Sequence, residues 1–268
     1  MIKKLLPIII LLIFFIGCSS KQSMIKNEET IQKKIYTTQN TNSLVQKSGQ
    51  YPVGIVNKSD IIIQTPNDSQ IIKGTNADYF FINPTDGWKA SYNFIGMFNE
   101  DMILYKTNNG GKTWDEIANL KNNTLPIGDK TGIYFIDSNK GWITSNTPWE
   151  GIIGLYSTDD SGITWNKQNL NIPDNYKHSL INAYPPLFFS NLDGILLTFP
   201  ASESTKQNFL FFVTNDGGKT WNSVLDRIGK LGNMKWNFQN SASINNYEVT
   251  YNNTIWFFDN GNWYKRIS

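Results

Sequence analysis

The chain has 268 residues, with 24 basic and 22 acidic side chains, and 14% of its residues are aromatic. Residues 1–17 contain two lysines and no acid, so the rest of the chain is formally neutral. It therefore lacks the basic surface that neutralises nucleic-acid phosphates, and no nucleic-acid partner is expected. One cysteine and one histidine, Cys18 and His178, exclude an intramolecular disulfide and a histidine cluster, so no metal and no cofactor is expected.

The N-terminal segment predicts a signal peptide over residues 1–17. Lys3 and Lys4 precede an apolar run of 12 residues, Leu5 to Ile16, whereas a membrane-spanning helix needs about 20. The sequence Phe-Ile-Gly-Cys that ends at Cys18 resembles a bacterial lipoprotein box. The resemblance implies cleavage before Cys18, lipid attachment to its sulfur, and an extracytoplasmic protein anchored to the bacterial cell membrane. The alternative is an uncleaved membrane anchor in which Cys18 is unmodified.

Residues 18–50 are predicted to be the lipidated cysteine and a flexible tether. The segment is rich in Lys, Gln, Asn, Ser and Thr, so it cannot bury enough apolar surface to offset the entropy of ordering. A flexible chain of this length has a root-mean-square reach of roughly 30 Å. The tether would hold a folded domain, predicted over residues 51–268, clear of the lipid headgroups.

One octapeptide occurs three times in this domain. TNNGGKTW begins at Thr107, TDDSGITW at Thr158 and TNDGGKTW at Thr214, at spacings of 51 and 56 residues. The pairs Gly87-Trp88, Gly141-Trp142 and Gly194-Ile195 keep nearly the same period. Two landmarks with a shared period of this length indicate a repeat architecture.

Each repeat predicts four short strands: an aromatic one, one that starts at the glycine pair, one that leads into the octapeptide and one that leaves it. The predicted fold is therefore all-β, a β-propeller of four-stranded antiparallel blades. A fourth, degenerate repeat is predicted near the C-terminus, where FDNGNW (Phe258 to Trp263) shortens the octapeptide. Tyr51 to Lys73 would complete this last blade; the alternatives are a fifth blade or an open arc closed by dimerisation, and the oligomeric state stays open.

The octapeptide resembles the Asp box (BNR repeat), because all three copies match at Thr, Gly, Thr and Trp. The acid or amide can accept backbone N–H bonds within the turn, the glycine allows a positive φ, and the tryptophan buries a large ring. A structural role is preferred over calcium or sugar binding. The residues concerned are Asn109, Gly111, Trp114, Asp160, Gly162, Trp165, Asp216, Gly218 and Trp221.

Among Asp-box proteins, the chain most resembles the photosystem II stability/assembly factor type of propeller. That family places an aromatic strand and a Gly-Trp pair ahead of each box, as Phe80-Phe81 with Gly87-Trp88 do here. The likeness covers about Asn76 to Ile267 and implies a non-enzymatic propeller that holds partners. It does not identify the partner.

A sialidase is disfavoured, because sialidases hold the substrate carboxylate with three arginines and this chain has two, Arg227 and Arg266. Another glycoside hydrolase of the sialidase-like superfamily, acting on cell-wall or host sugars, needs only two facing carboxylates and is the alternative function. Its candidate acids are Glu100, Asp101, Glu150 and Glu203.

The unequal loops opposite the octapeptide turns are the predicted binding surface, since loops on a rigid scaffold often carry function. The candidate residues are Trp149, Glu150, Tyr184, Glu100 and Glu203. Trp149 beside Glu150 suits a sugar or a peptide, although Trp149 could equally fold inward over its own blade. The sequence thus predicts a lipid-anchored, non-catalytic protein- or glycan-binding or assembly module of the cell envelope.

Overall fold

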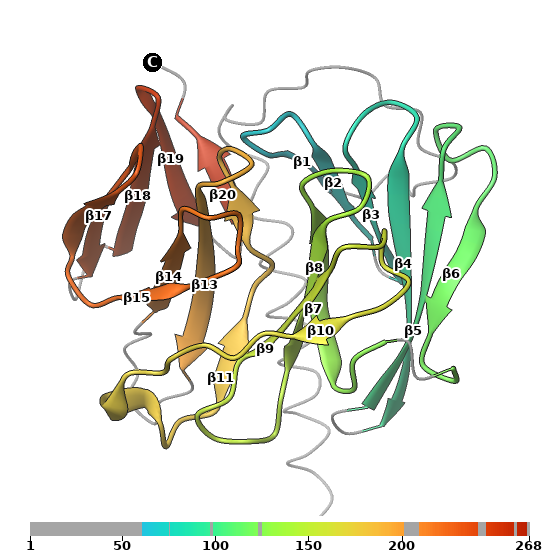
Figure 1. The fold of residues 1–268 in the computed structure, drawn as a ribbon, viewed down its shortest axis with the longest axis horizontal. Helices are drawn as coiled ribbons and strands as arrows, with labels where there is room; N and C mark the ends of the chain where they lie inside the picture. Colours follow the sequence, from blue (N-terminus) through green and yellow to red (C-terminus); the bar gives the residue numbers. More distant parts are fainter. Residues whose placement is uncertain are drawn as a thin grey trace, which may run out of the picture. The chain divides into compact units, whose positions relative to one another are not determined.

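The computed structural model describes residues 61–74, 76–96, 99–122, 125–200, 209–240, 245–259 and 262–266, all of which belong to the unit Leu44–Ser268. Apart from one short 3-10 helix, η2 (Asp174–Tyr176), the regular elements of these residues are strands. The strands form four antiparallel sheets (Figure 1). The all-β prediction is confirmed.

In the first, second and fourth sheets, strands that are neighbours in the chain are also neighbours in the sheet. The first sheet contains β1 (Ile61–Gln64), β2 (Gln70–Lys73), β3 (Ala77–Phe81), β4 (Gly87–Gly96), β5 (Asn99–Thr107) and β6 (Asp115–Asn119). The second contains β7 (Asp129–Phe135), β8 (Gly141–Asn146), β9 (Gly154–Thr158) and β10 (Asn166–Lys167).

The third sheet contains β11 (Ile181–Ala183), β12 (Leu187–Phe188), β13 (Gly194–Pro200), β14 (Leu210–Thr214) and β15 (Asn222–Val224). Both β11 and β12 pair with β13, so they are two parts of one strand interrupted at Tyr184-Pro185-Pro186, where prolines cannot donate to the ladder. The fourth sheet contains β16 (Ile228–Leu231), β17 (Met234–Asn240), β18 (Asn245–Tyr251), β19 (Thr254–Asp259) and β20 (Asn262–Lys265).

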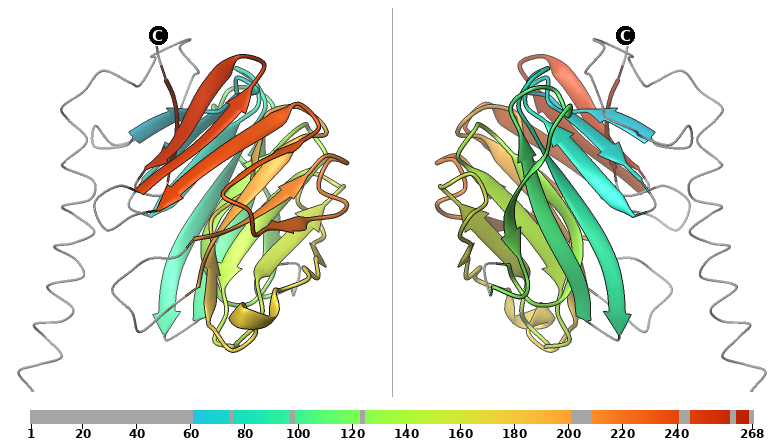
Figure 2. Two further views of the ribbon diagram at one scale, coloured as in Figure 1. Left: turned by 90° about the vertical axis from the view of Figure 1, so that its left-hand side faces the viewer. Right: turned by 90° about the vertical axis from the view of Figure 1, so that its right-hand side faces the viewer.

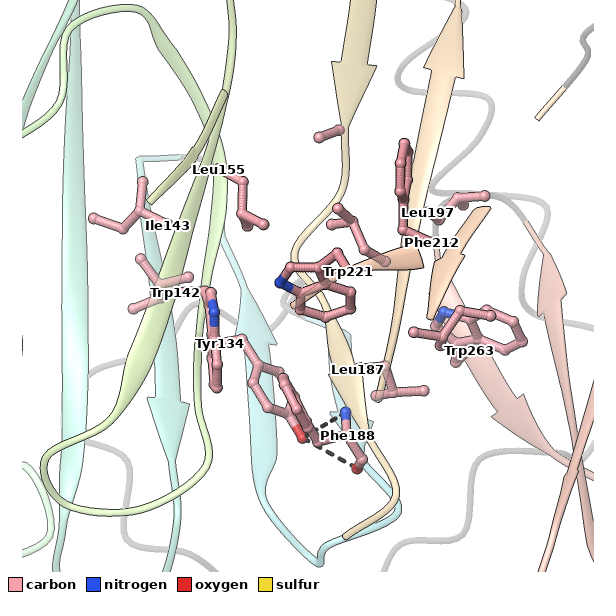
Figure 3. Packing of buried hydrophobic residues seen from close by; sticks show 14 of the residues in the cluster. Tyr134, Trp142, Ile143, Leu155, Leu187, Phe188, Leu197, Phe212, Trp221 and Trp263 are labelled. Atoms are coloured by element: carbon pink, nitrogen blue, oxygen red, sulfur yellow. Dashed lines mark hydrogen bonds between the residues drawn. The ribbon is translucent and has the colours of Figure 1, made fainter. Parts of the chain in front are cut away.

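Aromatic stacking joins the first three sheets in a repeated way. Trp88 of β4 lies flat on Phe135 of the second sheet, with ring centroids 3.7 Å apart. Trp142 of β8 stacks in the same way on Phe188 of the third sheet, at 4.4 Å (Figure 3). The Gly-Trp pairs of the sequence therefore place Trp88 of the first sheet and Trp142 of the second against the aromatic strand of the following sheet.

The aromatic strands themselves meet at the centre of these three sheets. Tyr134 lies between Phe80 and Phe188, with ring centroids 5.0 and 5.9 Å away. Its hydroxyl accepts a hydrogen bond from the Phe188 backbone N–H at 3.2 Å and lies 3.4 Å from the Phe188 carbonyl (Figure 3). Burial raises the pKa of this phenol far above its usual value, so Tyr134 is a neutral core residue.

The prediction treats the fourth sheet as a repeat of the first three, but its strands follow the reverse order between the centre and the outside. In the second and third sheets the chain begins with the central aromatic strand and moves outward, as it also does from β3 onward in the first sheet. In the fourth sheet, Tyr184 contacts Phe258 of β19, whereas Phe211 of β14 stacks on Phe238 of β17. The last strands thus lie toward the centre and the first ones outside, as Figure 1 shows. The chain crosses directly from the outer strand β15 to the outer strand β16.

This reversal corrects the position of the predicted fourth octapeptide. Tyr251, at the end of β18, donates a hydrogen bond to Asp193, which lies in the turn that contacts the third Asp box. Phe258, which begins FDNGNW, instead contacts Phe209 at the start of the strand that leads into that box. Asp259 and Asn262, the facing ends of β19 and β20 within FDNGNW, therefore lie at the opposite end of the sheets from the Asp boxes.

The segment expected to complete the last blade belongs in part to the first sheet. Ile61–Gln64 pairs with Gln70–Lys73, which pairs with β3, so this hairpin extends the inner edge of the first sheet. Asn67 in its turn accepts a hydrogen bond from Tyr134. In Figures 1 and 2 the blue hairpin and the red strands of the fourth sheet lie at the same end of the molecule. Residues 51–60 lie outside the described part of the chain.

Candidate functional site

The blades have two distinct ends. The Asp-box end carries the turns 108–113, 159–164 and 215–220. The loop end carries the tip of the β4–β5 hairpin, the start of β7, and the loops 147–153 and 174–180. The strands β5, β9 and β14 each run from the loop end to the Asp-box end. A ligand bound at one end therefore lies a full strand length away from the other end.

The third Asp box shows what the octapeptide does locally. Asp216 accepts hydrogen bonds from the backbone N–H groups of Lys219 and Thr220 at 3.0 Å and from the hydroxyls of Thr214 and Thr220. Desolvation raises the pKa of this carboxyl, but these hydrogen bonds outweigh it and lower the pKa to about 2. The carboxylate is therefore occupied in closing its own turn.

The other two boxes repeat this arrangement. Asp160 accepts the Thr164 N–H at 2.8 Å and the hydroxyl of the same residue at 2.6 Å. Asn109 accepts the Thr113 N–H at 3.0 Å and, as an amide, donates to the Thr113 hydroxyl at 2.8 Å. Replacing the acid by an amide therefore keeps the turn.

The glycine and tryptophan that recur in each box are used in packing. Gly111, Gly162 and Gly218 have φ of 80°, 97° and 75°. The ring of Trp221 lies edge-on to Phe188 at 5.9 Å, and Trp114 and Trp165 make the same contact with Phe81 and Phe135. Trp221 is buried and the other two are half-buried. These ring contacts are made with buried aromatic residues of the sheets, so the three tryptophans have a structural role.

Glu100 belongs to a polar cluster at the loop end, between the first and second sheets. Its carboxylate accepts the backbone N–H of Lys130 at 2.9 Å, and the Lys130 ammonium donates to the Gly128 carbonyl at 2.6 Å. Desolvation lowers the pKa of Lys130 to about 8, against the raising effect of Glu100, Asp129 and Asp101. Desolvation also raises the pKa of Glu100.

A second group of charges lies beside this cluster. Lys73 forms an ion pair with Asp78 at 2.7 Å, and the Tyr92 hydroxyl donates to the same carboxylate at 3.3 Å. Burial, followed by the charges of Asp78 and Glu100, raises the pKa of Tyr92 well above its usual value. A phenol in this environment stays protonated, so it is a poor nucleophile.

Trp149 stands out from the loop end on a fixed backbone. Its side chain is 66% exposed, so the alternative in which it folds inward is wrong. The next residue, Glu150, forms an antiparallel bridge with Leu180, and the Gly151 N–H donates to the Ser179 carbonyl at 2.9 Å. These bonds tie the loop 147–153 to the loop 174–180, so the position of the tryptophan is set by two loops.

The remaining predicted residues do not converge on Trp149. The Glu150 carboxylate lies 3.8 Å from Nδ1 of the exposed His178, while Tyr184 is half-buried with its ring edge-on to Phe258. Glu100 contacts Lys130 instead. Glu203 and Cys18 lie outside the described residues.

Asp78 and Lys130 are the functional candidates that the sequence did not reveal. Neither belongs to a motif, and they come together with Glu100 only because β3, β5 and β7 meet at the sheet junction. In the described part of the chain no group of three or more His, Cys, Asp or Glu side chains could hold a metal ion. No described helix has the length and hydropathy that crossing a membrane requires.

No protein-family model and no curated protein sequence matches the chain. Among solved structures, it is similar to a GH74 xyloglucanase from Xanthomonas campestris, with 11% identity over 84% of this chain and a TM-score of 0.35. It is also similar to YCF48, solved bound to a D1 peptide, with 17% identity over 80% of this chain and a TM-score of 0.26. The chain spans 38% of the xyloglucanase and 72% of YCF48. Both likenesses concern the fold alone.

Proposed function

We propose that the protein is a lipid-anchored, extracytoplasmic and non-catalytic binding module of the bacterial cell envelope. Its partner is an envelope protein or a glycan, and the loop end makes the contact. The observation that carries the proposal is the exposure of Trp149 on a backbone held by hydrogen bonds from a second loop. A rigid, exposed aromatic side chain provides a large contact area at little entropic cost, which is why such residues dominate binding interfaces.

Two features of the polar side chains support binding over catalysis. The boxes use their acids to close turns, and the polar cluster uses Asp78 and Glu100 to join neighbouring strands. A glycoside hydrolase needs a general acid and a second carboxylate that both reach the substrate. The raised pKa of Glu100 favours the hydrolase alternative.

We expect Trp149→Ala to weaken capture of the partner at least tenfold, because truncation of a central aromatic anchor typically costs 2 kcal/mol or more. The measurement is binding of the purified folded domain to envelope extract and to a glycan array. Leu192→Ala is the matched control, since Leu192 is also exposed but lies at the Asp-box end.

Equal binding by the Trp149→Ala variant and the wild type would contradict the assignment of the loop end. The hydrolase alternative is tested on the same preparations with chromogenic glycosides. Turnover by the wild type that disappears in Glu100→Gln would overturn the non-catalytic part of the proposal.

Anchoring through Cys18 is a separate part of the proposal, supported by the lipoprotein-box resemblance. We expect the full-length protein to incorporate labelled fatty acid in bacterial cells and to fractionate with membranes, and Cys18→Ala to abolish the incorporation. Cys18 is the only thiol in the chain, so the label has no other cysteine to modify. Label retained in Cys18→Ala would exclude this anchor.

A further inference from the structure

At the loop end of the β7–β8 pair, three buried side-chain oxygens have no hydrogen-bond partner: Oδ1 of Asp129, Oδ1 of Asn146 and Oγ of Ser145. The first two belong to residues that face each other across the pair, as the first residue of β7 and the last of β8. Facing side chains of an antiparallel pair lie on the same side of the sheet, with Cβ atoms about 4.5–5.5 Å apart.

Oxygens buried without a partner are uncommon, because a polar atom removed from water normally finds a donor in the protein or in an ordered water or ion. Here the two facing atoms are both acceptors and one belongs to a carboxyl group. The Lys130 ammonium donates to the Gly128 carbonyl, and it makes no hydrogen bond to Oδ1 of Asp129. Burial raises the pKa of Asp129, and the charge of Lys130 lowers it by a smaller amount.

A cation satisfies both oxygens together, as a bridging water does, and it also balances the charge of the carboxylate. A carboxylate and an amide carbonyl are hard oxygen ligands of the kind that calcium takes, and calcium completes its six to eight positions with water. Both residues are partly exposed, so solvent can reach the outer side of such an ion. Zinc is disfavoured, because its structural sites are built mainly from cysteine and histidine, and neither type is a member of this pair.

We propose that Asp129 and Asn146 bind a calcium ion at the base of the loop that carries Trp149. With one carboxylate the affinity falls in the weak range, with a dissociation constant of about 10⁻⁴–10⁻³ M, as in extracellular calcium modules. Asn146 lies three residues before Trp149, so the ion would hold the end of β8 against β7 directly below the loop. The calcium site does not depend on the proposed function, because it can be measured without the partner.

The test is the melting temperature of the folded domain at increasing CaCl2, with MgCl2 and NaCl of equal ionic strength as references. Binding to the native state alone raises the melting temperature, by about 3 °C or more once calcium exceeds the dissociation constant about tenfold. We expect this rise in the wild type, its loss in Asp129→Asn, and a rise at lower calcium in Asn146→Asp, which adds a second carboxylate.

Asp137→Asn is the matched control, because it makes the same change at the Asp-box end of the same hairpin, where Asp137 accepts N–H bonds from Asn139 and Lys140. Its calcium response should equal that of the wild type. An Asn146 amide that is turned over and donates its own N–H to Asp129 predicts no calcium response in the wild type. That result, or an equal response in Asp129→Asn, would overturn the proposal.

Discussion

Replacing Trp88 by alanine is expected to lower the free energy of unfolding by about 3–5 kcal/mol, the range for large aromatic residues in protein cores. Trp88 is fully buried, stacks on Phe135 of the next sheet and donates its indole N–H to the Ser161 carbonyl at 2.8 Å. The substitution therefore leaves a cavity and an unpaired carbonyl at the junction of two sheets. Urea unfolding of the folded domain measures the change.

Trp149→Ala is the matched control for this prediction. It makes the same substitution at an exposed position, where the cost of a surface change is about 0.5 kcal/mol or less. Equal destabilisation by the two variants would show that the stack of Trp88 on Phe135 does not hold the first two sheets together.

Gly218→Ala is expected to destabilise the fold by about 2–4 kcal/mol, although it adds only one methyl group. Gly218 has a φ of 75°, and a non-glycine residue in that region costs about 1–2 kcal/mol. The new Cβ would also lie 2.6 Å from a carbon of the Trp142 ring, which cannot move away because it is stacked on Phe188. The third Asp box would have to separate from the second sheet.

Thermal or urea unfolding measures this effect, with Gly96→Ala as the control. A Cβ at Gly96 meets no atom within 4 Å, and its φ is outside the positive range, so a change within about 0.5 kcal/mol is expected. A Gly218→Ala variant as stable as Gly96→Ala would contradict the tight packing of the box against Trp142.

The regular sheets could be predicted from the sequence because each carries a signal with a physical cause. An octapeptide that closes a turn with its own side chains leaves a recognisable set of Thr, Asp or Asn, Gly and Trp. The glycine of each Gly-Trp pair lies against the aromatic strand of its own sheet, since a Cβ at Gly87 would lie 2.5 Å from the Phe81 ring. These local requirements recur once per sheet and so give the period.

The strand order of the fourth sheet differs from the prediction because the sequence pattern does not encode the order of inner and outer strands. A strand pattern does not specify whether the chain moves toward or away from the centre, and Asp-Asn-Gly-Asn suits any tight hairpin turn. Only contacts that are distant in sequence, such as Tyr184 with Phe258 and Phe211 with Phe238, determine the direction. The β1–β2 hairpin was misplaced for the same reason.

The sequence can predict the part of the candidate site that depends on a single residue, but not the part where residues of several sheets meet. Trp149 follows a proline in a loop, and the sequence allows either an exposed ring or one folded inward over its own blade. The cluster of Asp78, Glu100 and Lys130 joins residues from three strands, and a single lysine in a loop-rich sequence has no motif that would identify it. The facing oxygens of Asp129 and Asn146 depend on strand register, which the sequence pattern does not provide.

The central claim is that the loop end, and not the Asp-box end, contacts the partner. It is tested most directly by a photoreactive phenylalanine analogue, placed at Trp149 in one variant and at Leu192 in another, in cells that express the full-length protein. Both positions are exposed, so both report any neighbour within reach. The account predicts a specific crosslinked product from position 149 and background from position 192. A product of equal or greater yield from position 192 would contradict it.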